Sequence, residues 1–498
     1  MAGIVRSDTR LLMQLLSRGP KGLGLGTRSL RLASTVAKAA LDDSANSPKD
    51  KERIVVLGSG WAGYALARTL SPSKTERILI SPRSHFVFTP LLASTAVGTL
   101  EFRAVIEPVR RLGLTEFHQG WASDIDFKRK VIRVETNTSD EVPVRLTGGE
   151  LRKGQKFEVP YDKLVVAVGC YSQTFGVEGV KEHACFLRDV GDARAVRLKV
   201  LQAFEKAALP TSTAADRKKL LHFAVVGGGP TGIEFAAELH DLVHEDLSKL
   251  YPELMQHVAI TIYDIAPKVL PMFDQNLASY ATETFRRNGI RVKTEHHLQR
   301  IRRDGEVLMM SIKEEPEEVG AGVVVWSTGL MQNPLVGMLL NREMADGGKI
   351  AKDRKSGGIV TDSHLRVQIQ PMEDGAETTT LQDVFAIGDC AVIQGSSLPA
   401  TAQVASQQAS YLGKRLNAKT MTETETAAPF SFRDWGTMAY LGGWRAIHQS
   451  QADELKGRAA WILWRTAYLT KSMSIRNKLM IPVYWLVTWI FGRDISRF

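Results

Sequence analysis

Two sets of three glycines have the spacing at which dinucleotide-binding proteins hold phosphates. In one set, Gly227, Gly229 and Gly232 follow an apolar run over residues 221–226 and precede a helix-compatible stretch over residues 233–250. The first glycine of such a set makes the turn, the second lets the backbone approach a pyrophosphate, and the third lets helix pack on strand. The free N–H groups at the helix start then face the phosphates.

The other set is Gly58, Gly60 and Gly63, which follows the apolar strand-like run Arg53–Leu57 and precedes a short helical stretch. One such fingerprint alone would be a weak signal, because ordinary α/β domains also contain Gly-rich turns. Two of them about 170 residues apart predict an α/β fold with two Rossmann-like dinucleotide-binding domains, a flavin domain near the N-terminus and a nicotinamide domain inserted into it.

These fingerprints set the expected domain boundaries. The chain of 498 residues is long enough for about three domains. We expect a presequence at 1–50, a flavin domain at 51–190 and 351–429, a nicotinamide domain at 191–350, and a C-terminal amphipathic helical membrane-surface module at 430–498.

The ends of the second strands differ between the two predicted domains. In the first, Ser81 stands where many such folds have an acid for the ribose hydroxyls, so the ribose must be held another way; Arg83 nearby is a candidate to cover the adenine. In the second, Asp264 ends the strand-like run 258–263. A carboxylate there accepts hydrogen bonds from the ribose hydroxyls and repels a 2′-phosphate. Asp264 therefore favours NADH over NADPH.

Several later strands end in small residues and are predicted to return to the cofactors. A run at 164–168 ends at Gly169, and a run at 322–327 ends in Thr-Gly beside the nicotinamide. A run at 381–387 ends in Gly-Asp, whose carboxylate can accept a flavin ribityl hydroxyl. The predicted cofactor contacts are Gly58, Gly60, Trp61, Ala62, Gly63, Ser81, Arg83, Gly169, Gly227, Gly229, Thr231, Gly232, Asp264, Thr328, Gly329, Gly388, Asp389 and Ala402.

The stretch SPRSHFVFTPLLASTAVGTLEFRAVIEP at 81–108 resembles the type II, rotenone-insensitive NADH:quinone oxidoreductases of fungal and plant mitochondria. The resemblance extends over about residues 51–498. It implies non-covalent FAD, with Thr89, Pro90 and Leu91 beside the flavin ring. It further implies hydride transfer from NADH to FAD and then two electrons to ubiquinone, without proton pumping.

The same resemblance implies two catalytic residues. Gln403, after Ala402 at the start of a helix, would line the quinone site; many relatives have His three residues later, where this chain has Ser406. Glu234, two residues past the third glycine, would contribute to nicotinamide placement or proton handling. A first-turn partner of the helix dipole is the alternative reading of Glu234.

Both ends of the chain point to a mitochondrial membrane. Residues 1–50 hold eight basic and four acidic residues with a short leucine stripe, the composition of a mitochondrial presequence. Six of the nine tryptophans lie after residue 430, among basic residues, which favours attachment in the plane of a membrane. No apolar run is long enough to span the bilayer. We expect a peripheral inner-membrane protein, with the matrix face favoured.

Three cysteines, Cys170, Cys185 and Cys390, without CxxC spacing predict neither a metal site nor a dithiol centre. Two alternatives stay open. A sulfide:quinone oxidoreductase needs a cysteine pair at the flavin, which spacing alone does not exclude. A non-catalytic NADH-bound flavoprotein with a signalling role is the other. The expected partners are NADH, ubiquinone and a membrane surface, with no nucleic acid; a homodimer stays open.

Overall fold

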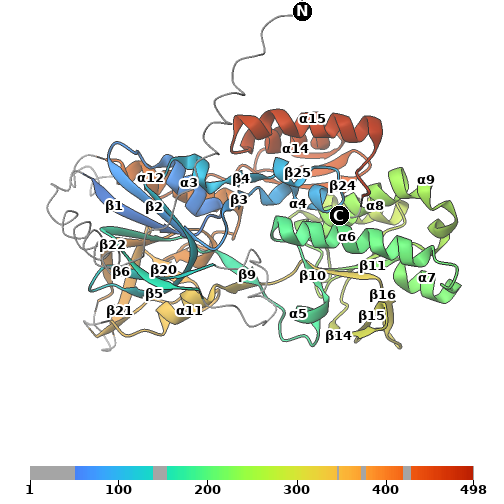
Figure 1. Ribbon diagram of the computed structural model, residues 1–498, viewed down its shortest axis with the longest axis horizontal. Helices are drawn as coiled ribbons and strands as arrows, with labels where there is room; N and C mark the ends of the chain where they lie inside the picture. The colour runs from blue at the N-terminus through green and yellow to red at the C-terminus, as the bar shows by residue number, and fades with distance from the viewer. Residues whose placement is uncertain (1–50, 138–153, 345–346, 372–376, 419–427, 497–498) are drawn as a thin grey trace, which may run out of the picture. The chain divides into compact units, whose positions relative to one another are not determined.

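The structure, a computed structural model, describes residues 51–137, 154–344, 347–371, 377–418 and 428–496. The predicted presequence at 1–50 lies outside the described residues. The first part of the described chain is built around a large mixed sheet, the second around a parallel sheet, and the last around a small antiparallel sheet with two helices (Figure 1).

The first sheet has its strands in the order β23-β20-β21-β22-β8-β1-β2-β5-β6-β7, with β19 pairing with β21. Strands β22, β8, β1, β2 and β5 are parallel, and glycine turns follow the carboxyl ends of β1, β8 and β22. The strand bounds are β1 Glu52–Leu57, β2 Thr75–Ser81, β5 Glu116–Asp126, β6 Val131–Thr136, β7 Lys156–Pro160, β8 Lys163–Val166, β19 Gly348–Ile350, β20 Ile359–Thr361, β21 Arg366–Pro371, β22 Thr379–Ala386 and β23 Ala391–Ile393. Strands β5, β6 and β7 form an antiparallel meander at the edge of this sheet.

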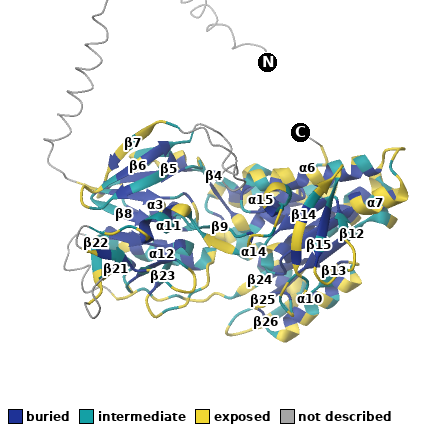
Figure 2. Cartoon of the chain, turned by 90° about the horizontal axis from the view of Figure 1, so that it is seen from below, coloured by how far each residue is buried: buried dark blue, intermediate teal, exposed yellow. Residues whose placement is uncertain are grey.

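Both faces of this sheet are covered, which explains why β1 is apolar at consecutive positions rather than alternately. Ile54 and Val56 pack with α3 (Trp61–Thr69) and α12 (Ala402–Leu416). Val55 and Leu57 pack on the opposite face with α11 (Pro334–Leu340). In Figure 2 the strands of this sheet and the helices on it are largely buried or intermediate, and the exposed residues lie mostly in loops.

The second sheet is entirely parallel, in the order β10-β17-β11-β12-β13. Its strands are β10 Cys185–Phe186, β11 His222–Val226, β12 Ala259–Tyr263, β13 Arg291–Lys293 and β17 Val323–Trp326, with β14 Leu298–Asp304, β15 Val307–Ile312 and β16 Val319–Ala321 as a side sheet. Its helices are α5 Val180–His183, α6 Val190–Ala207, α7 Ala214–Leu220, α8 Pro230–Leu242 and α10 Gln275–Arg287. The helix expected up to about Leu250 is confirmed: α8 continues through a π-helical turn, Val243–Leu247, into α9, Ser248–Leu250.

A two-stranded ribbon joins these two parts. In it, β9 (Cys170–Ser172) pairs with β18 (Leu330–Gln332). Because β10 already belongs to the second sheet, the chain leaves the flavin part before the predicted boundary at 190. Because α11 packs in the flavin core, the chain returns before 351. Local sequence at 334–350 is helix-compatible in either domain, so only tertiary packing decides this boundary.

The C-terminal module differs from the helical one expected, because it opens with an antiparallel sheet. Strands β24 (Thr437–Gly442), β25 (Arg445–Gln449) and β26 (Glu454–Gly457) precede α14 (Arg458–Lys471) and α15 (Ile475–Phe491). Gly442 and Gly443 make the β24–β25 turn at φ values of 80° and 57°, which glycine adopts without strain. Among the described residues, no helix is both long and apolar enough to cross a membrane.

Short elements connect the first fingerprint to the module. They are β3 His85–Val87, the 3-10 turn Thr89–Leu91, α4 Leu92–Ala96 and β4 Ile106–Pro108. The buried α4 packs on both α6 and α8. The stretch whose sequence resembles type II enzymes therefore lies between the first fingerprint and the nicotinamide helix.

Candidate active site

The first fingerprint has the close packing that a dinucleotide turn requires. A Cβ built on Gly63 would lie 1.9 Å from the carbonyl oxygen of Gly58, and one on Gly58 would lie 2.4 Å from that of Ala167. A Cβ on Gly60 would meet nothing within 4 Å. The outer glycines thus hold helix and strands together, while the middle one faces open space where a pyrophosphate can approach the backbone. These residues fit FAD.

Three parallel strands bring their ends to this turn. Gly388, at the end of β22, lies against Ala62, since its Cβ would come within 3.1 Å of the alanine Cβ. The Gly388 N–H donates to Gln408 Oε1 of α12 at 2.7 Å. Asp389 follows and is partly buried; burial raises its pKa, while Arg188 opposes the rise. Gly169, with φ of 65°, makes the turn after β8.

Polar contacts fix the loop that resembles the family. Trp61 Nε1 donates to Thr89 Oγ1 at 2.9 Å, which joins the start of α3 to the turn at Thr89–Leu91. Ser81 Oγ lies 2.8 Å from Ser59 Oγ, and both side chains are buried. Ser59, within the fingerprint itself, was not among the predicted residues. The pair supplies hydroxyls where the usual ribose-binding acid is missing.

Arg83 has a partner that the sequence did not reveal. Its Nε lies 2.8 Å from Asp189 Oδ2, and His85 Nε2 lies 3.4 Å from the other carboxylate oxygen. Asp189 is the N-cap of α6 and is mostly buried. The guanidinium is therefore held at the start of α6, so any contact with adenine would be made from that position.

The second fingerprint repeats the geometry of the first. A Cβ on Gly232 would lie 2.0 Å from the carbonyl oxygen of Gly227, while Gly229 faces open space. Gly227, with φ of 114°, packs against Ser327 and Thr328, so the turn that continues to Gly329 lies on the fingerprint. Thr231 is exposed in the first turn of α8. These residues fit the pyrophosphate and the nicotinamide of NADH.

Asp264 lies at the end of β12, beside this turn. Its carboxylate accepts hydrogen bonds from the N–H groups of Gly228 and, at 2.7 Å, Ala266. These bonds orient the carboxylate next to the fingerprint, where the ribose of a bound dinucleotide would reach it. The choice of NADH over NADPH stays a prediction from this position.

Replacing Asp264 with Asn should lower the ratio of kcat/KM for NADH to that for NADPH on the order of tenfold or more, because a carboxylate beside a 2′-phosphate is a like-charge contact. Steady-state kinetics with both nucleotides measure the ratio. Asp274→Asn is the matched control, since Asp274 caps α10 and Asn caps equally well. A ratio that Asp264→Asn leaves unchanged would remove Asp264 from the nucleotide site.

Gln403 lies at the second position of α12, next to Ala402, but its amide is already engaged. Its Oε1 accepts from Trp435 N at 2.9 Å and its Nε2 donates to Gly436 O at 3.3 Å. Gln403 therefore joins α12 to the start of the C-terminal module. It can line a quinone path only from this position, where both of its amide atoms are bonded to the C-terminal module. Ser406 Oγ is buried and has no hydrogen-bond partner among the described residues.

Glu234 is fully enclosed between α8 and the C-terminal module. Its Oε1 accepts hydrogen bonds from Trp464 Nε1 at 3.0 Å and from Tyr440 N at 3.1 Å. Trp464 packs edge-on against Tyr468, which in turn lies 6.2 Å from Phe88, ring centroid to ring centroid. The carboxyl is thus connected by packed aromatic rings to the loop at Thr89, rather than exposed at the first turn of the helix.

The cysteines lack the properties of a redox pair. Burial raises the pKa of Cys170 to about 12 and that of Cys390 to about 11. Cys185 is buried in β10 of the other sheet, and burial raises its pKa as well. A thiol that stays protonated is a poor nucleophile. The arrangement disfavours the sulfide-oxidising alternative. Among the described residues there is also no group of three or more potential metal ligands.

Comparison with known proteins agrees with this geometry. The pyridine nucleotide-disulphide oxidoreductase family model matches residues 52–409, and the NDH2 C-terminal domain model matches residues 435–494. A probable NADH dehydrogenase of Dictyostelium discoideum is 39% identical, covering 90% of this chain and 92% of that protein. The chain belongs to the type II NADH:ubiquinone oxidoreductases.

Two further relatives come from a plant and a parasite. The internal alternative NAD(P)H-ubiquinone oxidoreductase A1, mitochondrial, of Solanum tuberosum is 36% identical, covering 91% of this chain and 89% of that protein. The structure of NDH2 from Plasmodium falciparum in complex with NADH has a TM-score of 0.78 at 25% identity, covering 90% of this chain and 100% of that one. As a member of this family, the protein binds FAD and NADH.

This type II enzyme places two further acids beside Glu234 on the same face of α8. Glu238 accepts from Ser94 Oγ at 2.5 Å and Thr99 Oγ1 at 2.8 Å. Asp241 accepts from Tyr440 O–H at 2.6 Å. All three are buried. The spacing of four and three residues makes one polar stripe, which is satisfied by α4 and by the C-terminal module.

The pKa of Glu234 is raised to about 8 from its ordinary value near 4.5, mainly by burial and also by Glu238; the bonds from Tyr440 and Trp464 oppose the rise. A raised acid pKa means that the folded state binds the proton more tightly. The free energy of unfolding should therefore fall as the pH rises from 4.5 to 8, then stop changing. Glu234→Gln should flatten the fall in melting temperature over this range, measured by flavin fluorescence. An identical slope in both proteins would contradict the raised pKa.

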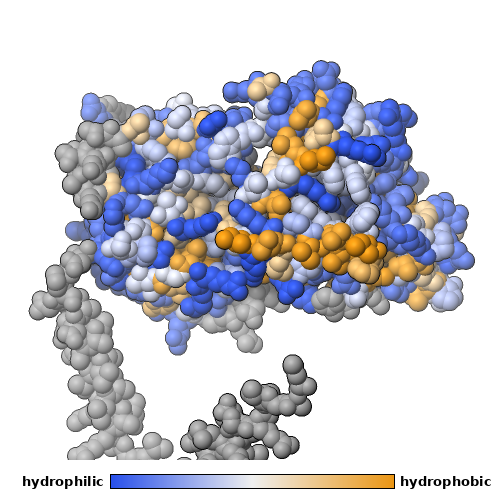
Figure 3. Space-filling view, turned by 90° about the horizontal axis from the view of Figure 1, so that it is seen from above, coloured by the Kyte–Doolittle hydropathy of each residue, from blue (hydrophilic) through white to orange (hydrophobic). Residues whose placement is uncertain are grey.

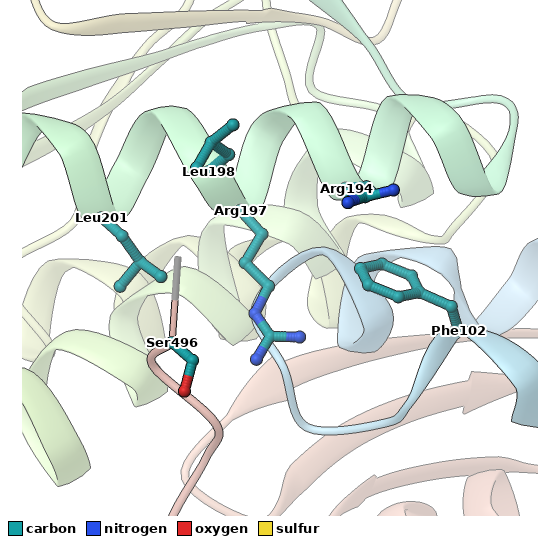
Figure 4. A pocket seen from close by; sticks show the side chains of 6 residues that line it. All are labelled: Phe102, Arg194, Arg197, Leu198, Leu201 and Ser496. Carbon is teal, nitrogen blue, oxygen red and sulfur yellow. The ribbon is translucent and has the colours of Figure 1, made fainter. Parts of the chain in front are cut away.

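The last described residues form ion pairs that attach the C-terminal module to the nicotinamide part. Arg493 Nη1 lies 2.7 Å from both Glu245 and Asp246 of the π-helical turn, and its Nε donates to Thr99 Oγ1 at 3.0 Å. Arg197 of α6 pairs with Asp494 at 2.9 Å. Figure 4 shows this guanidinium pointing from its helix toward the tail, between Phe102 and Ser496.

Some of these site residues were missed from sequence for a physical reason. Gln408, Arg188, Ser59 and Trp464 act through contacts with residues distant in the chain. Gln408 had one available signal, because it lies on the same helix as Gln403. A buried Trp464 carries no signal at all until β24 and α8 are placed together.

Proposed function

We propose that this protein oxidises NADH and reduces ubiquinone through bound FAD. The observation that carries the proposal is a pair of glycine turns, each with a tightly packed first and third glycine and an open second one, in one chain with an NDH2-type C-terminal module. Bound FAD supplies an isoalloxazine ring that accepts hydride from NADH and releases two electrons to a quinone.

The residues of the chain bind and orient the two nucleotides. The turns at Gly60 and Gly229 present backbone N–H groups to the pyrophosphates, and Asp264 selects the unphosphorylated ribose. Thr328 and Gly329 lie against the second turn and would limit where the nicotinamide ring can lie. Trp61 and Thr89 hold the loop that would run beside the flavin.

The quinone path is expected where α12 meets the C-terminal module. Gln403 is hydrogen-bonded there to the backbone of Trp435 and Gly436. Glu234 accepts a hydrogen bond from Trp464, which packs against Tyr468. Quinone reduction consumes protons, and a buried carboxyl whose pKa is near 8 can hold one at neutral pH. Glu234 is therefore the group that we expect to keep a proton close to the quinone.

The module also supplies a surface for a membrane. Helix α15 leaves a row of apolar side chains exposed, Ile475, Leu479, Val483, Leu486, Val487, Trp489, Ile490 and Phe491. Figure 3 shows the apolar residues gathered in a band on the side where α15 lies in Figure 1. Of the six C-terminal tryptophans, Trp464 and Trp485 do not contribute to this surface, because they are buried in the core. We assign the attachment to the exposed row.

Replacing Leu479, Val483 and Leu486 together with Ser should weaken partition into liposomes roughly a hundredfold, because each residue loses on the order of 1 kcal/mol of apolar transfer free energy. Flotation with vesicles measures the change. Leu209 and Leu250 are also more than half exposed but lie in the nicotinamide part, so their replacement with Ser is the control. If the triple variant floats as well as the control, α15 does not face the membrane.

We further place the protein peripherally on the inner mitochondrial membrane, on the matrix side. The relatives carry mitochondrial names, and the basic, leucine-striped residues 1–50 have the composition of a presequence. Protection of the protein from added protease in mitochondria whose outer membrane has been opened would support the matrix side. Digestion under those conditions would place it on the outer face.

The activity itself is tested with NADH, a soluble ubiquinone analogue and the FAD-loaded protein. Steady consumption of NADH that requires quinone supports the proposal. A protein that binds NADH yet turns over neither substrate would be the signalling flavoprotein. Quinone-dependent consumption of sulfide in place of NADH would instead identify the sulfide-oxidising alternative.

A further inference from the structure

Arg465 on α14 is held between two tryptophans. Its guanidinium carbon lies 4.4 Å from the ring centroid of Trp461, one turn earlier on the same helix, and 4.3 Å from that of Trp485 on α15. Trp444, in the β24–β25 turn, stacks on Trp461 at 5.2 Å with an interplanar angle of 16°. These four side chains form a column that crosses the junction of the sheet and the two helices.

The cation in this column has no anion beside it. Among the described residues, no carboxylate lies within ion-pair distance of Arg465, and its buried Nε has no hydrogen-bond partner. Glu238 attracts it from further away, but the carboxylate oxygens of Glu238 are already bonded to Ser94 and Thr99. Removing a charge from water without a partner is unfavourable, and the stacked indoles offset only part of the cost.

Arg465 as a whole is only partly buried, and Nε is its one nitrogen that is buried without a partner among the described residues, so Nη1 and Nη2 are the part that an external ligand can reach. It lies between α14 and α15, the helix with the exposed apolar row. Trp444 and Ile462 nearby in the module are also exposed. The indoles cover the flat face of this arginine, and its outer edge has no partner in the part of the chain that the structure describes. Such an arginine has the geometry for a bidentate contact with a phosphate.

We propose that Arg465 binds the phosphate of an anionic phospholipid at the junction of α14 and α15. The proposal rests on the attachment of α15 to a membrane proposed above, and it adds a specific headgroup contact to an otherwise apolar surface. The lipid phosphate accepts hydrogen bonds from the guanidinium edge, while Trp461 and Trp485 keep the planar group oriented. The exposed side chains of α15 would contact the acyl chains.

The test compares binding of the FAD-loaded protein to phosphatidylcholine vesicles with and without phosphatidylglycerol. Arg465→Gln should lose on the order of tenfold or more of the affinity gained from phosphatidylglycerol, as for a hydrogen bond to a charged group. Arg458→Gln is the matched control, since Arg458 is exposed at the start of the same helix. It should lose only about fivefold, the effect of one basic residue near an anionic surface.

Arg465→Lys separates charge from shape, because lysine keeps the charge but lacks the flat fork. It should behave more like Arg465→Gln than like the wild type, with FAD absorbance and NADH oxidation in detergent retained. A second comparison measures thermal shifts with soluble short-chain phosphatidylglycerol and with inorganic phosphate. A shift with both ligands, lost in Arg465→Gln, would assign a free-phosphate site instead of a lipid site.

The proposal is overturned if Arg465→Gln and Arg458→Gln lose the same fraction of the phosphatidylglycerol effect, or if the wild type shows no such effect. Neither result would touch the proposed activity, because NADH oxidation by a soluble quinone without lipid is measured separately. Conversely, an inactive protein that binds phosphatidylglycerol through Arg465 would contradict the proposed function and leave the lipid site standing.

Discussion

Gly232→Ala should leave FAD bound and lower the rate of flavin reduction by NADH on the order of a hundredfold, the cost of a misplacement of about 1 Å at a reacting site. The added Cβ would lie 2.0 Å from the carbonyl oxygen of Gly227 and 2.6 Å from Ser327 Oγ. The start of α8 must therefore move away from the turn that would hold the NADH pyrophosphate. Stopped-flow absorbance of the flavin after mixing with NADH measures the rate.

Two variants control this result. Gly337→Ala in α11 adds the same methyl group in a helix where nothing lies within 4 Å, so it should change neither rate nor FAD content. Gly63→Ala makes the equivalent clash in the first fingerprint and should instead release FAD. If Gly232→Ala lost FAD and Gly63→Ala kept it, the two nucleotide sites would be assigned in reverse.

Arg493→Gln should destabilise the docking of the C-terminal module by about 3 kcal/mol, because it leaves buried acids without their cation. Its side chain is 6% exposed and contacts Asp246, which is 11% exposed. Glu238 lies close enough to be stabilised by it too. Hydrogen exchange of amides in β24 and α15 is the appropriate measurement, since loss of docking need not unfold the nucleotide domains.

Arg129→Gln gives the matched comparison. Arg129 pairs with Glu158 at 3.1 Å, but the pair lies on the surface of the first sheet, where water screens it. We expect almost no change in exchange anywhere. Equal effects of the two substitutions would mean that Arg493 is not buried among acids in solution, and that the tail does not hold the module.

The fold could be predicted well where local chemistry determines local geometry. Gly58 and Gly227 require positive φ, which few residues other than glycine adopt, so their spacing identifies two turns without any knowledge of the core. Asp264 follows directly from its place at the end of an apolar strand. The strand ending at Gly388 and Asp389 was recognisable for the same reason.

The remaining site depends on contacts between distant segments, which local patterns do not encode. The position of Glu234, two residues past the third glycine, predicts nothing of its neighbours in the fold, yet β24 and Trp464 enclose it. Gln403 is expected to line the quinone site, yet its amide also bonds a turn that begins 32 residues later. Trp464 and Trp485 are of the residue type found in membrane belts, but they fill the core. The reason is that β24 and β25 form a sheet beneath α14, which helical periodicity did not predict.

The central claim, that one chain passes electrons from NADH through FAD to a quinone, is tested most directly by a two-step anaerobic experiment. The FAD-loaded protein is mixed with one equivalent of NADH and then with a ubiquinone analogue, while the flavin absorbance near its oxidised maximum is followed. We expect rapid bleaching with NADH and full recovery with quinone, with one quinol formed per NADH oxidised. Bleaching without recovery by quinone, or quinone reduction without prior bleaching, would contradict the account.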